Sequence, residues 1–259
     1  MKTRLDKALV ERGLVTSRER AQALILAGRV LVAEQKVEKP GASVEDDSAL
    51  RVLGEDLRYV SRGGLKLERA IEYWRVALEE RACVDVGAST GGFTDCMLQH
   101  GAVSVLAIDT GYGQIAHKLR TDARVTLMER CNARLLKAGE LVTLSSQMLG
   151  GPVSFLAMDV SFISATLVLP AVLGALVREG EKWHGEAVVL IKPQFEAGRE
   201  HVGKGGIVRD EAARQIAIER VRGCVTELGG AEIEVIESPI TGAEGNVEHL
   251  LHTRFGGRL

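Results

Sequence analysis

From residue 82 to residue 253, short apolar segments alternate with segments of helical periodicity. Repeated strand–helix units of this kind are typical of a mostly parallel sheet with helices on both faces. In such sheets ligands bind beyond the carboxyl ends of the strands. We therefore predict a doubly wound α/β fold whose site is formed by strand ends and the loops that follow them. The expected strands are 82–86, 104–109, 124–129, 153–159, 186–192, 231–238 and 246–253.

The segment CVDVGASTGGFTD (83–95) joins the first expected strand to a helix through a glycine-rich turn. A dinucleotide-binding turn has the pattern G-x-G-x-x-G, and its middle glycine would fall at Ser89, so the match fails. Asp85 lies at the strand end, where a carboxylate would repel a pyrophosphate and would suit an ammonium group. S-adenosylmethionine fits these requirements better, because it carries an amino-acid end and a sulfonium.

Two more polar residues follow the next strands. Asp109 ends the second strand, where a carboxylate can accept hydrogen bonds from two ribose hydroxyls. Asn132 follows the third strand and is placed to bind an adenine edge. A single acid of this kind is usually a loop cap, but Asp85 and Asp109 together favour a methyltransferase cofactor site. The expected cofactor contacts are Asp85, Gly87, Ala88, Ser89, Gly91, Gly92, Phe93, Asp109, Asn132 and Asp159.

A second glycine-rich segment, GREHVGKG (198–205), begins like a nucleotide-binding P-loop. The residue after the lysine is Gly205 instead of serine or threonine, so the magnesium ligand is missing. Pro193 and Gln194 also separate this segment from the preceding strand. We expect a mobile, cationic loop beside the active site that contacts RNA.

The fourth expected strand ends in AMDVSF (157–162). Methyltransferases that act on exocyclic base nitrogens typically carry D-P-P-Y or N-P-P-Y there. Those that act on cytosine C5 need a nucleophilic cysteine beside a proline, and none of the four cysteines has a proline neighbour. The chain instead offers two lysines and two carboxylates that suit a ribose 2′-hydroxyl. These candidate catalytic residues are Lys66, Asp159, Lys192 and Glu248.

A ribose 2′-hydroxyl must lose its proton as it attacks a methyl group. A partly desolvated lysine near a second lysine gives up its own proton more readily. It can then accept the hydroxyl hydrogen bond and stabilise developing alkoxide charge. Lys192 fits best, because it ends the apolar run EAVVLI (186–191), where a charge without a function costs free energy. Lys66 and Glu248 also fit exposed positions on a helix and a strand.

Residues 1–57 follow a different pattern. Apolar residues recur at helical spacing from Leu5 to Gly13, and a second helix, capped by Thr16 or Ser17, extends to Gly28. The expected strands that follow are 29–37 and 48–53. We therefore expect a compact α+β unit.

The net charge of −2 is unevenly distributed. Residues 1–39 carry nine Lys and Arg against five Asp and Glu, a balance of +4, whereas residues 40–58 carry two against five, a balance of −3. A local basic surface can bind phosphate while the whole protein stays near neutral. The alternative is a solvated face without a partner. The candidate RNA-binding residues are Arg4, Lys7, Arg18, Arg20 and Arg62.

Several absences favour a reduced, cytoplasmic compartment. The longest apolar stretch, 165–177, contains Pro170 and is too short to cross a bilayer, so we expect a buried helix. The N-terminal residues lack the apolar region of a secretory signal. The cysteines form no C-x-x-C pair. His249 and His252 have no third ligand type beside them, so we expect a helix or strand surface and no metal.

The motifs SRGGLKL, DVGASTGGFTD, AIDTGYGQ, MDVSFIS, LIKPQFEAGRE, GGIVRD and GNVEHLL resemble the hemolysin A (TlyA) family of ribosomal RNA ribose 2′-O-methyltransferases. RLDKALV and the pattern S-R-x-x-A-x-x-L-I-x-x-G-x-V from Ser17 resemble the S-four-like RNA-binding fold. The family is similar to the heat-shock ribosomal RNA methyltransferases, whose Lys-Asp-Lys-Glu tetrad maps onto Lys66, Asp159, Lys192 and Glu248. The resemblance implies a Rossmann-like, S-adenosylmethionine-dependent enzyme. Its implied substrate is the cytidine 2′-hydroxyl in large-subunit RNA, small-subunit RNA or both.

These observations predict an S-four-like RNA-binding domain (1–57), a linker (58–64) and a methyltransferase domain (65–259). We expect ribosomal RNA or ribosomal subunits as partners, no membrane, and a monomer. Two alternatives stay open. One is an RNA-binding ribosome assembly factor with an inactive methyltransferase fold. The other is a membrane-lytic haemolysin, which would need a long apolar or strongly amphipathic segment.

Overall fold

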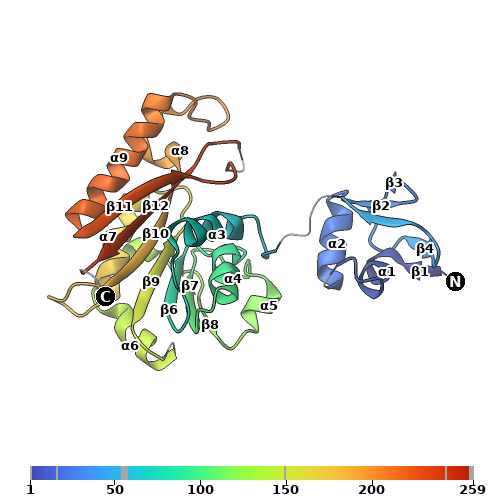
Figure 1. Cartoon of the computed structure of the whole chain (residues 1–259), viewed down its shortest axis with the longest axis horizontal. Coiled ribbons are helices and arrows are strands. Elements are labelled where there is room, and N and C mark those ends of the chain that lie inside the picture. The colour runs from blue at the N-terminus through green and yellow to red at the C-terminus, as the bar shows by residue number, and fades with distance from the viewer. Residues whose placement is uncertain (1, 16, 54–57, 149, 243, 257–259) are drawn as a thin grey trace. The chain divides into compact units, whose positions relative to one another are not determined.

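The computed structural model describes residues 2–15, 17–53, 58–148, 150–242 and 244–256. The chain divides into two compact units, Met1–Arg58 and Tyr59–Leu259 (Figure 1). The expected end of the first domain at residue 57 lies outside the described residues. The expected linker 58–64 differs from this division, because Tyr59 is buried in the core of the second unit and helix α3 (Gly63–Trp74) already begins there.

The first unit contains the two expected helices, α1 (Leu5–Glu11) and α2 (Arg18–Leu26). Ser17 caps α2 by accepting a hydrogen bond from the Arg20 backbone N–H at 3.2 Å, whereas Thr16 lies outside the described residues. Leu5, Leu9 and Ile25 are fully buried between the helices and strands. The spacing of apolar residues in the sequence therefore correctly predicted the core of this unit.

The strands of the first unit depart from prediction. The expected single strand at 29–37 is a hairpin, in which β2 (Val30–Val32) and β3 (Gln35–Lys36) pair antiparallel. Ala33 and Glu34 form the turn with positive φ angles of 48° and 62°, a conformation usually signalled by Asn or Gly. The turn was not predicted from the sequence because neither Asn nor Gly occupies these two positions. The other strands are β5 (Leu50–Val52), which pairs with β2, and β1 (Lys2–Arg4), which pairs with β4 (Ser43–Glu45).

The second unit is built on a seven-stranded sheet of order β11-β12-β10-β9-β6-β7-β8. The neighbours from β10 to β8 are parallel, as predicted, whereas β12 runs antiparallel to both β10 and β11. The strands are β6 (Ala82–Val86), β7 (Ser104–Ile108), β8 (Val125–Met128), β9 (Val153–Met158), β10 (Gly185–Ile191), β11 (Gly230–Glu237) and β12 (His249–Phe255). The strand order reverses between β6 and β9, and ligands bind at such a switch point in open α/β sheets.

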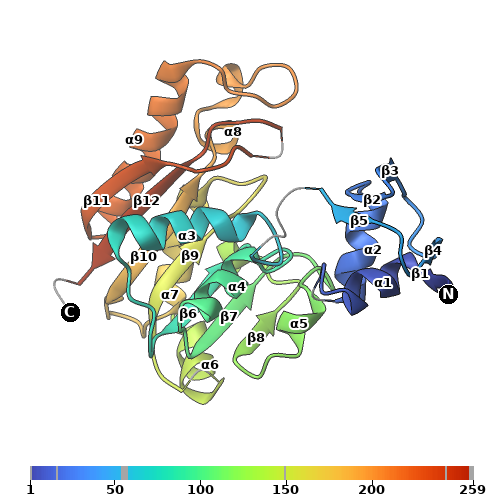
Figure 2. The same cartoon turned by 45° about the vertical axis from the view of Figure 1, so that its right-hand side comes forward.

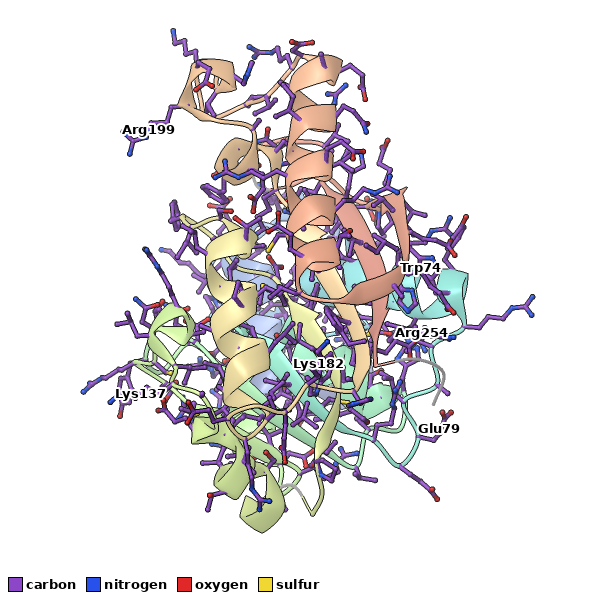
Figure 3. All side chains as sticks on the ribbon, turned by 90° about the vertical axis from the view of Figure 1, so that its left-hand side faces the viewer. Trp74, Glu79, Lys137, Lys182, Arg199 and Arg254 are labelled. Carbon is purple, nitrogen blue, oxygen red and sulfur yellow. The ribbon has the colours of Figure 1, made fainter. Side chains whose placement is uncertain are left out.

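Helices cover both faces of this sheet, which confirms the predicted fold class. One face carries α3, α4 (Gly92–Gln99) and α5 (His117–Arg120), with α3 and α4 in front of the sheet in Figure 2. The opposite face carries α6 (Glu140–Met148), α7 (Ala165–Ala175) and α9 (Glu211–Glu227), and Figure 3 looks onto α7 and α9. The short helices η1 (Ala133–Leu135), α8 (Pro193–Glu196) and η2 (Arg199–His201) lie in the loops.

The apolar helix predicted at 165–177 is α7, which packs Val168, Leu169 and Val172 into the core. Among the described residues, no helix is both long and apolar enough to cross a membrane.

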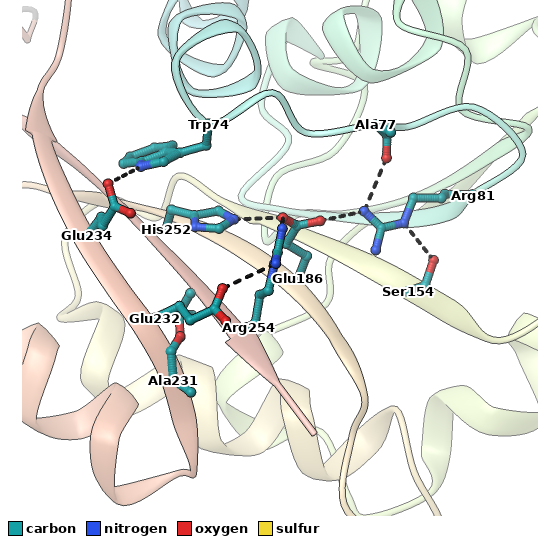
Figure 4. A network of polar contacts seen from close by, with 11 residues as sticks. Trp74, Ala77, Arg81, Ser154, Glu186, Ala231, Glu232, Glu234, His252 and Arg254 are labelled. Carbon is teal, nitrogen blue, oxygen red and sulfur yellow. Dashed lines mark hydrogen bonds and ion pairs between the residues drawn. The ribbon is translucent and has the colours of Figure 1, made fainter. Parts of the chain in front are cut away.

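A buried polar network fastens α3 to the antiparallel half of the sheet (Figure 4). Glu186 on β10 accepts hydrogen bonds from Arg81 at 2.7 Å and from His252 Nε2 on β12 at 2.8 Å. Trp74 stacks on the His252 ring with centroids 5.0 Å apart. The expectation that His252 lies on the surface was wrong, because this side chain is only 5% exposed.

Candidate active site

The glycine turn after β6 is compact because three backbone segments meet there. Gly87 has a φ of +88°, and a Cβ at this position would collide with the backbone carbonyl of Asp159 at the end of β9. A Cβ on Gly92 would collide with Ser61 and with the Gly64 backbone at the start of α3. These glycines therefore let the turn lie directly against the ends of β9 and α3.

Asp109 fixes the next part of the site. Its carboxylate accepts hydrogen bonds from the Ser89 backbone N–H at 2.8 Å and the Gly111 backbone N–H at 2.6 Å. Asp109 thus ties the glycine turn to the end of β7. Each carboxylate oxygen retains further acceptor capacity for a ligand.

Asp85 does not lie where the sequence suggested. Its side chain is fully buried, accepts a hydrogen bond from the Thr94 hydroxyl at 2.6 Å, and lines neither of the cavities described below. Burial raises the pKa of Asp85 to about 7, the Thr94 hydrogen bond opposes this rise, and the Asp159 charge adds to it. The strand alternation explains the difference, because Asp85 points into the layer between β6 and α4.

Two cavities meet at the ends of the parallel strands. They have volumes of about 410 Å³ and about 390 Å³ and share the lining residues Gly87, Ser89, Asp159, Ser161 and Phe162. Ala88, Gly92 and Phe93 line the first cavity, and Asp109 and Asn132 line the second. Among the expected cofactor contacts, Gly91 and Asp85 line neither. The Asn132 side-chain oxygen accepts a hydrogen bond from the Arg134 backbone N–H at 3.2 Å.

All four candidate catalytic residues line the first cavity. Lys192 Nζ lies 2.5 Å from Asp159 Oδ1 and donates to the Ser161 hydroxyl at 2.6 Å. Lys66 forms an ion pair with Glu248, and both side chains are buried. The structure therefore pairs each lysine with a carboxylate. Buried charges are tolerated when they are paired in this way.

The sheet topology explains why residues so distant in sequence meet. Asp159 and Lys192 follow the adjacent parallel strands β9 and β10, so they leave the sheet at the same edge. Glu248 precedes β12, which runs antiparallel to β10 and therefore begins at that edge. Lys66 reaches the cavity from the first turns of α3, beside the glycine turn.

A model of the FtsJ-like methyltransferase family matches residues 59–255, and a model of the S4 domain matches residues 3–48. The chain belongs to the FtsJ-like methyltransferases. It is 42% identical over 254 residues to "16S/23S rRNA (cytidine-2'-O)-methyltransferase TlyA" of Mycobacterium tuberculosis, covering 98% of this chain and 90% of that protein. It is 40% identical over 250 residues to "Hemolysin A" of Brachyspira hyodysenteriae, covering 96% and 98%. A solved structure of a candidate hemolysin from Streptococcus thermophilus is 41% identical, with a TM-score of 0.71, over 99% of this chain and 90% of the other.

The RNA-binding candidates of this FtsJ-like methyltransferase occupy different surroundings. In the S4 unit, Arg4 and Arg18 both donate to the buried Asp6, while their own side chains stay about half exposed. Lys7 pairs with Glu11 at 3.3 Å on α1. Arg62 lines the first cavity in the methyltransferase unit. No local sequence pattern indicated that Asp6 would bind two of these cations.

The glycine-rich segment 198–205 is not a P-loop in this methyltransferase fold, because α8 separates it from β10 and the segment itself contains η2. Arg199 on η2 points away from the body of the unit (Figure 3). The buried Asn246 holds the following residues, accepting from the Val208 backbone N–H at 2.9 Å and donating to the Gly206 carbonyl at 2.8 Å. The residues that follow the segment are therefore attached to the loop that carries Glu248.

Proposed function

We propose that this chain transfers a methyl group from S-adenosylmethionine to the 2′-hydroxyl of a cytidine in ribosomal RNA. The observation that carries the proposal is the convergence of Lys66, Asp159, Lys192 and Glu248 on one cavity. That cavity adjoins a second one lined by the glycine turn and Asp109. The FtsJ-like family and the function named for the mycobacterial relative support the same chemistry.

The second cavity fits the adenosine part of S-adenosylmethionine. Asp109 offers carboxylate oxygens to ribose hydroxyls, and Ile163 and Val168 provide apolar walls for a base. Gly87 of the glycine turn lines this cavity and lies directly against the end of β9. Bound there, the cofactor supplies an electrophilic methyl group on its sulfonium.

Lys192 is the residue that we assign to the proton transfer. In its neutral form, Nζ accepts a hydrogen bond from the ribose hydroxyl and takes its proton as the oxygen–methyl bond forms. Asp159 and the Ser161 hydroxyl already stand beside Nζ to hold the ammonium that results. The electron pair of the broken carbon–sulfur bond stays on sulfur. Lys66, held by Glu248, orients the nucleotide and stabilises negative charge on its oxygen.

The S4 unit supplies the RNA affinity in this proposal. Arg4, Lys7, Arg18 and Arg20 contact phosphates, which position the enzyme without selecting a sequence. Arg62 contacts the RNA at the mouth of the first cavity. A stacked or paired target nucleotide must leave its stack to reach the methyl group. Because ribosomes are the substrate, we place the enzyme in the cytoplasm.

Methyl transfer to purified ribosomal subunits tests the proposal. Each subunit, prepared without the modification, is incubated with labelled S-adenosylmethionine and with either the wild-type or the Lys192→Ala protein, and the RNA is digested to nucleosides. We expect label in 2′-O-methylcytidine with the wild type only. Cofactor binding without label on either subunit or on precursor particles would favour the assembly-factor alternative. The absence of a thermal shift with the cofactor would contradict the proposal altogether.

A further inference from the structure

We infer that Glu196 is a positioning residue of the active site, whose buried carboxylate fixes the loop carrying Asp159 and Ser161 relative to Lys192. The inference rests on the proposed methyl transfer. Glu196 does not line either cavity, so its action on the reaction is through these residues.

The geometry links two segments that carry the candidate catalytic groups. Glu196 is 2% exposed and ends α8, the short helix that begins directly after Lys192. One of its carboxylate oxygens accepts from the Ser164 hydroxyl at 2.5 Å, and the other accepts from the Ala165 backbone N–H at 2.6 Å. Ser164 in turn caps α7, at the end of the loop that follows Asp159. The carboxylate therefore joins α8 to the start of α7.

The backbone of the loop between these points has few hydrogen bonds. The Asp159 backbone N–H donates to the Val86 carbonyl at 2.9 Å, which fixes its first residue. Within the described part of the chain, residues 160–163 make no backbone–backbone hydrogen bond. Phe162 has a φ of +63°, a strained conformation that persists only where the surroundings enforce it. Side chains also hold the loop between its ends, because Ser161 accepts from Lys192 and the Phe162 ring lies 5.6 Å from the Phe195 ring. The hydrogen bonds to Glu196 hold its second end.

Burial of the Glu196 carboxylate costs free energy. No ion pair to its side chain is found among the described residues, and Arg220 contacts only its backbone carbonyl, at 3.1 Å. Burial raises the pKa of Glu196, while the Ser164 and Ala165 hydrogen bonds and the Arg220 charge oppose the rise. The N-terminus of α7 offsets part of this cost through its backbone dipoles. A buried polar side chain is costly unless its hydrogen bonds are made, so Glu196 is best explained by the two segments that it joins.

Loss of the hydrogen bonds between Glu196 and the start of α7 should lower the rate constant for methyl transfer more than it weakens the binding of cofactor or RNA. A displacement of about 1 Å in an aligned catalytic group can reduce the rate about 100-fold. We expect Glu196→Ala to lower the single-turnover rate constant about 10- to 100-fold. The dissociation constant for the ribosomal subunit should stay within about threefold of the wild type, because the S4 unit is unchanged. The dissociation constant for S-adenosylmethionine should change less than the rate constant, because the loop forms only part of the second cavity and Asp109 and the glycine turn are unchanged.

Glu196→Gln provides the rescue. Its amide oxygen can accept from the Ala165 N–H while its amide group donates to the Ser164 oxygen. We therefore expect at least a third or so of the wild-type rate constant with this variant, since both links between α8 and α7 are kept. Glu219→Ala is the matched control, because it removes a carboxylate that is 56% exposed on α9.

All variants are compared by single-turnover methyl transfer below the lowest melting temperature. A Glu196→Ala protein as fast as the Glu219→Ala protein would overturn the inference, as would a parallel loss of cofactor affinity. If Glu196→Ala does not fold, Ser164→Ala removes one of the two links, and a rate constant equal to that of the wild type would count against the inference. Failure of the wild-type protein itself to transfer methyl groups would refute the proposed function instead.

Discussion

Lys192 Nζ lies 2.5 Å from Asp159 Oδ1, and the pair bridges the ends of the adjacent parallel strands β10 and β9. Asp159 lines both cavities, whereas Lys192 lines only the first. The ion pair therefore stands where the cavity proposed for the cofactor meets the cavity proposed for the target nucleotide. This position separates the residues that should affect the chemical step from those that should affect cofactor binding.

Lys192→Ala should abolish transfer and leave cofactor binding intact. We expect the rate constant to fall at least about 100-fold, the usual effect of removing a group that transfers a proton. The dissociation constant for S-adenosylmethionine should change by less than about threefold, because Lys192 does not line the second cavity. Single-turnover kinetics and isothermal titration calorimetry measure the two quantities. Comparable losses in both would contradict the assignment.

Asp109→Ala should have the opposite effect. It removes the proposed acceptor for the ribose hydroxyls and also releases the Ser89 and Gly111 N–H groups that the carboxylate holds. Hydrogen bonds to a charged group contribute about 1.5–3 kcal/mol, so cofactor affinity should fall about 10- to 100-fold. At saturating cofactor the rate constant should recover to within a few-fold of the wild type. A rate defect that saturation does not relieve would count against this role.

The sequence predicted the parallel part of the sheet and the glycine turn because both depend on local patterns. The order of strands and the antiparallel β12 depend on long-range packing, and no local pattern encodes them. The contact between Lys66 and Glu248, 182 residues apart, was available only through the family resemblance. Asp85 was misplaced because a residue at a strand end can point either to the ligand or into the layer behind it. The contacts of Glu196 were not predicted, although this residue lies within the motif LIKPQFEAGRE.

Asp6→Asn should weaken RNA binding although it makes the protein more positive. The fully buried Asp6 carboxylate accepts from Arg4, Arg18 and Gln22, and the Arg4 guanidinium holds the pKa of Asp6 well below its usual range. An amide cannot accept all of these bonds, so both arginines should lose their fixed orientation. We expect a several-fold weaker subunit affinity, measured by filter binding across a salt series.

Glu11→Gln is the control for that experiment, because it removes an exposed carboxylate that pairs with Lys7 on α1. Simple electrostatics predicts that either substitution strengthens RNA binding, since each removes one negative charge. Stronger binding by both variants would show that Asp6 does not organise the arginines for RNA.

Asp85→Asn should flatten the pH dependence of stability between about pH 4 and pH 7. The pKa of Asp85 rises from 3.8 to about 7 in the folded state, chiefly through burial. The native protein therefore binds a proton in this range that the unfolded chain releases, so wild-type stability should fall as the pH rises. Denaturant unfolding at several pH values measures the slope. Equal slopes for both proteins would contradict a protonated Asp85, whatever their absolute stabilities.

Glu186→Gln should lower stability at neutral pH and remove an acid-sensitive component. Burial alone would raise the pKa of Glu186, but hydrogen bonds from His252 and Arg81 outweigh it and lower the pKa from 4.5 to about 2 (Figure 4). The carboxylate therefore stabilises the fold above pH 4.5 and loses this effect as the pH falls towards 2, by an amount of the order of a few kcal/mol. Glu232→Gln, which removes an exposed partner of Arg254, serves as the control. The network joins α3 to β10 and β12, so we expect Glu186→Gln to lower the melting temperature and to leave the rate constant for methyl transfer close to that of the wild type. A loss of activity without a loss of stability would show that the network affects the active site.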